Sequence, residues 1–320
     1  MRKFYLSLLI AIFAALGVNA QVTTGSISGT VKDMQGKVLA GATIQAVHEP
    51  SGTRYRTVSS TEGRFNLAAL RVGGPYKLTI SFVGYTQQEI SDINIQLGEP
   101  TKIDAVMVDT KNQLQEVVIA GTRKGALISK DRKGTSSNFN RRLITSLPTL
   151  GRNFTDITKY TPQGNGTSFA GQDNRFVNLT IDGSIFNNSF GLQALPGSQT
   201  NSAPISLDAI EEIQVNIAPY SVKEAGFTGG GINAVTRSGT NTLHASGFYN
   251  TRDEGLVGRK AGLNGKQAVV TTAFDVKQFG ASVGGAIIKN KLFFFANYEG
   301  ERRNDPGTNF IASDGTNTGA

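Results

Sequence analysis

Two alternating segments late in the chain constrain its fold most, because each repeats with a period of two over about ten residues. Apolar side chains alternate with small or polar ones in residues 279–287, before the turn Lys289-Asn290-Lys291. After this turn, in residues 292–301, one face is apolar throughout and the other becomes polar along the segment. A period of two places successive side chains on opposite faces of a β-strand. We therefore predict a hairpin with one apolar face. It belongs either to a soluble sandwich or to a transmembrane barrel.

The three consecutive phenylalanines of this hairpin, residues 293–295, raise the question of what covers both of its faces. Residues 243–250 alternate in the same way, and a long polar loop at 251–272 separates them from the hairpin. Strands of this length, joined by one short turn and one long polar loop, are typical of outer-membrane barrels.

The first part of the mature chain, residues 25–108, consists of short predicted strands separated by turns. The segment from Tyr76 to Phe82 alternates most clearly, and Gln35-Gly36 and Glu62-Gly63 are turn signals. Strand segments that recur about every ten residues, without helical periodicity, favour a small antiparallel β-sandwich.

The middle of the chain predicts a mixed unit. A strand–turn–strand pattern surrounds Asp182-Gly183, and Asp208 with Glu211 three residues later is a plausible start for a short helix. The helix is expected to give way to a strand at 213–217. The glycines at 229–231 indicate backbone packed too closely for side chains. The polar loop at 187–204 is a candidate for ligand contact.

Composition excludes several kinds of site. The chain has no cysteine, so it has no disulfide framework, cysteine nucleophile or cysteine-ligated metal. Its two histidines, His48 and His244, are predicted on polar strand faces, where catalysis or metal binding is unexpected. There is no phosphate-binding loop, paired carboxylate motif or Ser/His/Asp spacing, so we expect no enzymatic activity and no cofactor. The net charge is +8, but Lys and Arg are scattered, which argues against nucleic acid.

Residues 1–20 are predicted to be a signal peptide. Arg2 and Lys3 precede an apolar run, and a small-x-small motif ends at Ala20 before Gln21. The apolar run is shorter than the ~20 residues that a spanning helix needs. Cleavage is therefore expected between Ala20 and Gln21.

Residues 111–124 form a polar linker around the β-prone segment Glu116-Val117-Val118-Ile119. The residues alone leave two possibilities open. The segment is either one more strand of the sandwich or an exposed strand that adds to the sheet edge of a partner.

Several of these stretches resemble a known family. "GSISGTVKDMQGKVLAGATIQA" is similar to the carboxypeptidase-regulatory-like domain, and "LQEVVIAGTR" is similar to a TonB-box segment. "LDAIEEIQVNIAPYSVKEAGFTGGGINAVTRSGTN" resembles a receptor plug, and "GASVGGAIIKNKLFFFANYEGER" resembles early barrel strands. The chain thus resembles the N-terminal part of a TonB-dependent outer-membrane receptor of the Oar-like kind.

The resemblance implies a mainly β fold in five parts. They are a signal peptide (1–20), a transthyretin-like β-sandwich (21–110), a linker with the TonB box (111–124), a mixed α/β plug (125–241) and the first three strands of an incomplete transmembrane barrel (242–320). It also implies that Glu116, Val117, Val118 and Ile119 contact TonB. The plug motif would consist of Asp182, Gly183, Gly230, Gly231, Ile232, Asn233 and Thr236. Leu292, Phe294 and Tyr298 would face lipid, and Phe293 and Phe295 would face the plug.

The function implied by the resemblance is energised uptake of an unidentified scarce or bulky solute across the outer membrane of a Gram-negative-type envelope. Expected partners are TonB, with its inner-membrane proton-motive complex, and outer-membrane lipid. The sandwich and the TonB box would lie in the periplasm. The alternative is an exported multi-domain β-protein that acts as an adhesion or ligand-binding module.

Overall fold

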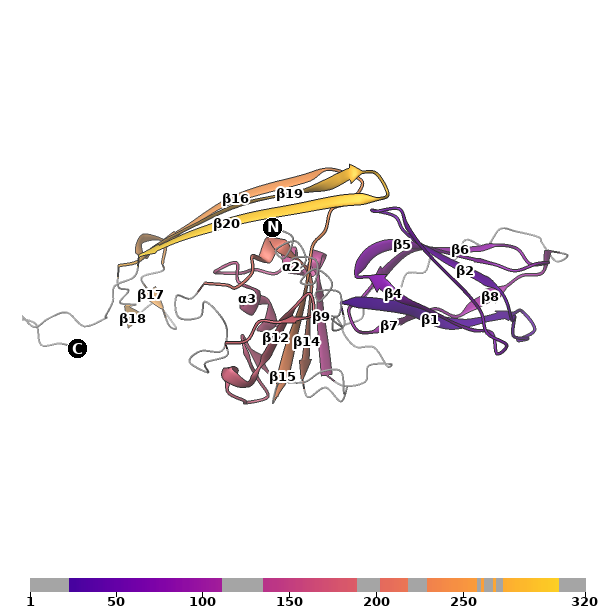
Figure 1. Ribbon diagram of the computed structural model, residues 1–320. Coiled ribbons are helices and arrows are strands. Elements are labelled where there is room, and N and C mark those ends of the chain that lie inside the picture. Colours follow the sequence, from indigo (N-terminus) through magenta and orange to yellow (C-terminus); the bar gives the residue numbers. More distant parts are fainter. Residues whose placement is uncertain are drawn as a thin grey trace, which may run out of the picture.

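The protein is seen in a computed structural model that describes residues 23–110, 135–188, 202–217, 229–257, 260–261, 267–268 and 273–304. The described residues form mostly strands, arranged in two compact units and one long sheet (Figure 1). The prediction of a mainly β chain is confirmed. No helix in these ranges has the length and apolar character needed to cross a membrane.

The first unit, residues 23–110, is a β-sandwich of two sheets. Its strands are β1 (Thr24–Asp33), β2 (Thr43–His48), β3 (Thr53–Val58), β4 (Arg64–Arg71), β5 (Gly73–Ser81), β6 (Gln88–Ile95), β7 (Pro100–Lys102) and β8 (Ala105–Met107). One sheet has the order β4-β1-β7, with β8 also paired to β1, and the other has the order β3-β2-β5-β6.

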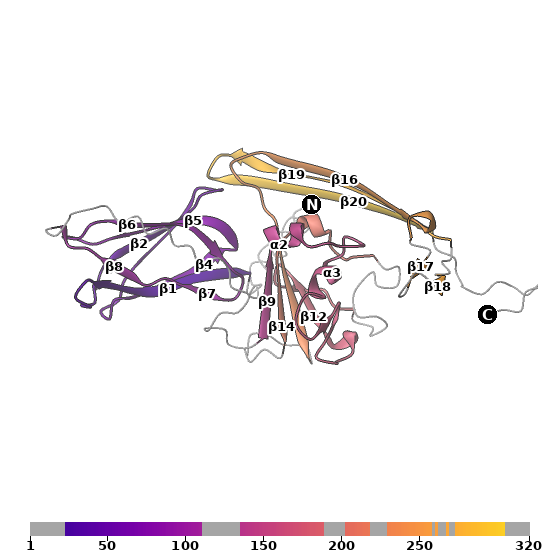
Figure 2. The same cartoon turned by 180° about the vertical axis from the view of Figure 1, so that it is seen from behind.

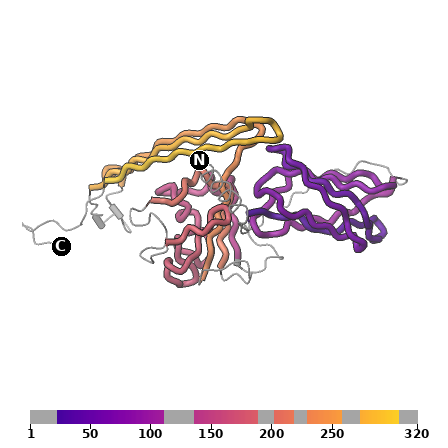
Figure 3. Tube along the Cα trace, in the orientation of Figure 1, coloured from indigo at the N-terminus to yellow at the C-terminus, as the bar shows by residue number. Residues whose placement is uncertain are grey.

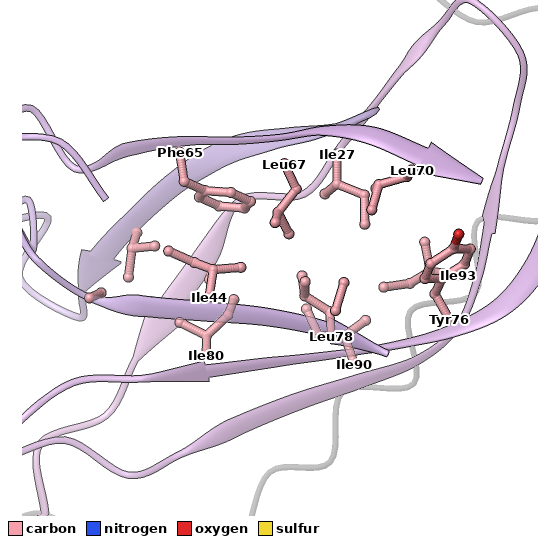
Figure 4. Packing of buried hydrophobic residues seen from close by; sticks show 14 of the residues in the cluster. Ile27, Ile44, Phe65, Leu67, Leu70, Tyr76, Leu78, Ile80, Ile90 and Ile93 are labelled. Atoms are coloured by element: carbon pink, nitrogen blue, oxygen red, sulfur yellow. The ribbon is translucent and has the colours of Figure 1, made fainter. Parts of the chain in front are cut away.

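The apolar faces of the two sheets meet in a closed core. Ile27 and Leu67 from one sheet pack against Ile44, Leu78 and Ile80 from the other (Figure 4). The predicted alternation of β5 is observed, since its apolar side chains are buried and the intervening ones are partly exposed. Each fully buried aliphatic side chain stabilises such a core by roughly 1.5–3 kcal/mol.

The prediction that His48 lies on a polar strand face is wrong. His48 is separated by two residues from Ala46 and by four from Ile44, so the period of two places all three side chains on the buried face of β2. The His48 ring lies 4.8 Å from the Tyr76 ring, and its Nδ1 is 2.6 Å from Ser51 Oγ. Desolvation, followed by the charge of Arg71, lowers the pKa of His48 to about 4. It is a neutral core residue.

The central unit, defined here as the described residues between 135 and 236, contains a five-stranded sheet with the order β13-β12-β15-β14-β9. Its strands are β9 (Thr135–Asn140), β12 (Asn178–Ile181), β13 (Ser184–Ile185), β14 (Ile210–Ile217) and β15 (Gly230–Thr236), beside the short pair β10 (Gly164–Asn165) and β11 (Ser168–Phe169). β12 and β15 are parallel, whereas β14 is antiparallel to both of its neighbours. β9 is therefore an edge strand.

Two short helices cover this sheet, α2 (Arg141–Ser146) and α3 (Phe154–Thr158). Each begins after an asparagine whose side-chain oxygen accepts a backbone N–H of the first turn, Asn140 for α2 and Asn153 for α3. Single 3₁₀ turns occupy Asn174–Phe176 and Leu207–Ala209.

The helix expected to start at Asp208 is only one 3₁₀ turn. The Ser206 hydroxyl caps this turn, and the chain enters β14 at Ile210, so Glu211 lies in a strand. The apolar side chains of β14 at every second position fill the core, and this burial outweighs a local helix signal.

The third unit, called here the long sheet, has the order β16-β19-β20. Its strands are β16 (His244–Asp253), β19 (Asp275–Ile288) and β20 (Leu292–Asn304), with the 3₁₀ turn Glu254–Leu256 and the short strands β17 (Lys260–Ala261) and β18 (Gln267–Ala268). β19 and β20 are antiparallel and meet at the predicted turn around Asn290. The long sheet extends over the central unit and one end reaches the sandwich (Figures 1, 2 and 3).

Candidate functional site

The predicted motif around Asp182 forms the junction between β12 and β15. Asp182 and Gly183 have φ angles of 48° and 81°, as expected for the tight turn between β12 and β13. The Asp182 carboxylate accepts the Thr236 N–H at 2.9 Å and the Thr236 hydroxyl at 2.6 Å. The Asp182 N–H donates to the carbonyl oxygen of Ala234 at 3.0 Å. The structure therefore brings Asp182 and Thr236 together as a clasp between the ends of two strands.

The glycines that precede β15 differ in how closely they are packed. A Cβ on Gly229 would lie 2.7 Å from a Gln172 side-chain atom, and one on Gly230 would lie 3.0 Å from the Phe169 ring. Close packing is confirmed at these two positions. At Gly231 it is wrong, because the nearest atom to an added Cβ is 3.8 Å away.

The remaining motif residues hold the middle of the central sheet. Ile232 is fully buried in the core. The Asn233 side chain accepts the Thr180 hydroxyl and donates to the Gln214 Oε1 at 3.4 Å. The motif thus consists of packing and hydrogen-bonding residues inside one sheet.

A charged cluster centred on Asp208 lies between the central unit and the long sheet. The Asp208 carboxylate contacts Arg141 at 3.0 Å and Arg152 at 2.7 Å. The Arg152 guanidinium also lies 3.8 Å from the centre of the Phe248 ring of β16. Such a cation–π contact is worth about 0.5–2 kcal/mol, depending on how well it is desolvated. The cluster therefore joins the central unit to the long sheet.

Phe295 is one of the three consecutive phenylalanines, and the structure shows what covers its face of the hairpin. The Arg237 guanidinium lies 5.0 Å from the centre of the Phe295 ring, so this side chain faces the central unit. Leu292 and Tyr298, on the other face of β20, are 48% and 67% exposed. Phe294 lies on the same face of β20 as Leu292 and Tyr298, but it is half-buried.

A buried polar junction joins the sandwich to the central unit, and sequence reasoning missed it. Glu212, only 1% exposed, accepts the Leu97 N–H at 2.9 Å, and Gln214 donates to the Leu97 carbonyl oxygen at 2.7 Å. Asn138 of β9 also donates to this carbonyl oxygen, at 3.4 Å. No local signal pointed to this contact, because Leu97 and Glu212 are 115 residues apart in the sequence.

Burial changes the acidity of this junction. Desolvation raises the pKa of Glu212 to about 8, and the negative charges of Glu211 and Glu99 act in the same direction. The Leu97 N–H opposes the shift, because it stabilises the carboxylate. Glu212 is therefore mostly protonated at neutral pH while the sandwich is in contact.

Other predicted positions fall outside the described residues. These are the cleavage site Ala20/Gln21, the TonB-box candidate Glu116–Ile119, and residues 189–201 of the candidate ligand loop. His244 is exposed and its Nε2 lies 2.7 Å from Thr242 Oγ1. Among the described residues, no group of His, Asp and Glu side chains is arranged to hold a metal ion.

Comparison with known proteins identifies two families within the chain. Residues 26–108 match the carboxypeptidase regulatory-like domain, and residues 235–318 match an outer membrane beta barrel domain. These two ranges correspond to the sandwich and to the region that contains the long sheet.

The curated relatives are transporters and receptors. The TonB-dependent transporter Oar of Myxococcus xanthus is 26% identical over 297 residues, which cover 88% of this chain and 27% of that protein. The TonB-dependent receptor SusC of Bacteroides thetaiotaomicron is 24% identical over 260 residues, which cover 78% of this chain and 24% of that protein. The chain thus spans about a quarter of the length of these relatives.

Among solved structures, the siderophore receptor PirA from Acinetobacter baumannii overlaps 53% of this chain and 24% of its own. The sequence identity is 20% and the TM-score is 0.39.

Proposed function

The chain is related to the N-terminal part of TonB-dependent receptors, and on this premise we propose that it serves energised uptake of a solute across an outer membrane. In this proposal residues 21–110 are a periplasmic sandwich and residues 111–124 are a linker with the TonB box. Residues 125–241 are the plug, and residues 242–320 begin the barrel wall. The relatives are named as transporters and receptors, and we propose no enzymatic activity.

The observation that carries the proposal is the two-sided character of the long sheet. One face contacts the plug through Phe248 and Phe295, and through a hydrogen bond from Gln278 Nε2 to the Gly151 carbonyl oxygen at 3.1 Å. The other face carries exposed apolar side chains, among them Leu243, Tyr249, Ile287, Leu292 and Tyr298. A barrel wall needs this combination, because lipid covers its outer face and the plug fills its lumen.

The energised step would act through the linker. We propose that Glu116–Ile119 pairs with TonB as an added strand, so that backbone hydrogen bonds supply the affinity. Force from the inner-membrane proton-motive complex would then reach the plug through residues 120–134. The solute would bind outside, with the plug loop 187–204 as a candidate contact.

A first experiment uses the behaviour of closed barrels. An antibody against residues 21–110 would be used to probe outer-membrane fractions by gel electrophoresis, with and without heating. We expect a band several hundred residues larger than this chain that shifts on heating. A soluble band near 34 kDa would instead favour the adhesion or binding module.

A second experiment tests the TonB contact directly. Because the chain has no cysteine, Val117→Cys would be its single thiol. We expect a disulfide with a cysteine placed in the strand-forming region of TonB. The control Ser129→Cys lies ten residues after the candidate box, just beyond the linker, and we expect it to cross-link weakly. Equal cross-linking at both positions would contradict the assignment of the box.

A further inference from the structure

We propose that the sandwich is a latch that ties the plug to the barrel wall and has to undock before the plug can move. The inference rests on the proposed function, because it assumes that force arrives through the linker. The sandwich contacts the plug and the first barrel turn at two separate anchors, which are made of different residues.

The first anchor is the corner between β6 and β7. Leu97 is fully buried, and both of its backbone hydrogen-bonding groups are bound by plug side chains, the N–H by Glu212 and the carbonyl oxygen by Gln214 and Asn138. Two residues later, Glu99 Oε1 accepts the Ser136 hydroxyl at 3.0 Å. The corner is therefore bound to side chains of both β9 and β14.

Gly98 permits this close approach. Its φ is +71°, and an added Cβ would lie 2.9 Å from Gln214 Nε2. Any other residue would be strained in this conformation and would also displace the amide that binds Leu97. The corner therefore packs directly against the surface of β14 at Gly98.

The second anchor involves the β2–β3 loop of the sandwich and the barrel. The Asn241 N–H donates to the Pro50 carbonyl oxygen at 2.8 Å. The Asn241 side chain donates to Asn290 Oδ1 at 2.8 Å and accepts the Asn290 N–H at 2.9 Å. Gly52 lies directly against the Asn290 side chain. Asn241 is the last residue of the proposed plug, and Asn290 is in the β19–β20 turn, so this anchor reaches the barrel wall through Asn290.

The two anchors lie on parts that have different roles in the proposed mechanism. The first is on β9 and β14 of the plug, which the linker pulls, and the second reaches the wall, which stays in the membrane. A pull on residues 116–119 reaches β9 at Thr135, and β9 is the edge strand of the plug sheet. A sandwich attached at both anchors therefore braces the plug against this pull.

The same pull also acts on the sandwich itself. The linker leaves the sandwich after Thr110, whose N–H donates to the Gly84 carbonyl oxygen at 3.1 Å. Gly84 lies beyond the far end of β5, and β5 begins at Gly73 beside Glu211 of the plug. The two ends of β5 are about 30 Å apart, because the strand has nine residues. Force applied at Thr110 therefore acts at the end of the sandwich that is far from the docked end. The resulting torque on the sandwich can loosen both anchors.

A disulfide across the second anchor tests the latch in the full chain in its outer membrane. A Cβ built on Gly52 lies 3.5 Å from the Cβ of Asn290, within the separation of about 3.5–4.5 Å found in disulfides. We would make Gly52→Cys together with Asn290→Cys; residues 1–320 contain no other cysteine. The matched control combines Asn290→Cys with Gly36→Cys. Gly36 is another sandwich glycine with positive φ, and an added Cβ there meets nothing within 4 Å.

The readouts are the yield of the disulfide and the force needed to extend the plug. A handle on an azide-bearing amino acid in place of Val117 would be pulled while the barrel stays in the membrane. We expect the first pair to oxidise and the control pair not to. We also expect plug extension at low force to be lost in the oxidised form and to return when the same molecules are reduced.

Each opposite result overturns the latch. If the first pair fails to oxidise, or oxidises no better than the control, then the docked arrangement is wrong. If the plug extends at the same or lower force when the disulfide is closed, then docking does not restrain it. Neither readout uses TonB, so a failed TonB cross-link at Val117→Cys would contradict the proposed function and leave this measurement valid.

Discussion

Replacing Glu212 with glutamine should remove most of a pH-dependence from the docking of the sandwich on the central unit. In the docked state burial raises the pKa of Glu212 from 4.5 to about 8. After undocking the carboxyl meets water and regains its ordinary pKa. A carboxyl whose pKa is raised in the docked state stabilises that state, and this contribution is fully present below pH 4.5. This contribution is lost as the pH rises toward 8.

The magnitude follows from the two pKa values. Between pH 5 and pH 7 the undocked carboxyl ionises almost completely, whereas the docked one stays mostly protonated. Docking should therefore weaken by about 2–3 kcal/mol over this range, which is a roughly 50- to 100-fold change in the equilibrium. Glutamine keeps an oxygen that can accept the Leu97 N–H but carries no charge. Glu212→Gln should therefore lose most of this dependence; Glu211, whose pKa burial also raises, should leave a smaller one.

Hydrogen exchange of the Leu97 amide, followed by mass spectrometry on the full chain in membranes, measures this equilibrium. After correction for the intrinsic exchange rate, its protection should fall from pH 5 to pH 7 in the native chain. The fall should be much smaller in Glu212→Gln. Glu211→Gln should keep most of the slope, because desolvation is the largest cause of the Glu212 shift. A flat native profile, or a slope that is undiminished in Glu212→Gln, would refute the reasoning.

Three further substitutions, two of them with a matched control, test the central unit and the long sheet. Gly230→Ala should destabilise the central unit by about 1–3 kcal/mol through overpacking against Phe169, whereas Gly231→Ala should change its stability by less than about 1 kcal/mol, as measured by urea-dependent proteolysis. By the same assay, Asp182→Ala should cost about 1–3 kcal/mol, because Thr236 loses both acceptors. Tyr298→Asp, which places a charge on the proposed lipid face, should reduce the heat-shifting band, whereas Tyr298→Phe should not.

The strands were largely predictable because their signal is local. In β5, the alternation of Leu78 and Ile80 with polar neighbours determines which face is buried, and the structure confirms it. The Asp182-Gly183 turn was equally predictable from the sequence, since few dipeptides tolerate two consecutive positive φ angles. The Asp182–Thr236 clasp is different, because 54 residues separate its two members and only the folded sheet brings them together.

Local signals failed where a second unit covered a surface or where burial outweighed them. His48 was assigned to the solvated face of its strand, yet its parity with Ala46 places it in the core. Asp208 and Glu211 suggested a helix, and the buried side of β14 favoured a strand. In both cases the burial of apolar neighbours outweighs the local preference of the residue. The type of a single residue does not reveal this burial.

The sequence by itself determined that this chain is mainly β, with a period of two in each strand and turn residues between strands. It determined these features because backbone sterics and side-chain polarity act between residues close in the chain. Only the tertiary structure decided that Glu212 and Gln214, polar residues on a strand surface, are buried against Leu97. The reason is physical: their environment comes from a different unit, whose approach depends on Gly98 and on the fit of two surfaces.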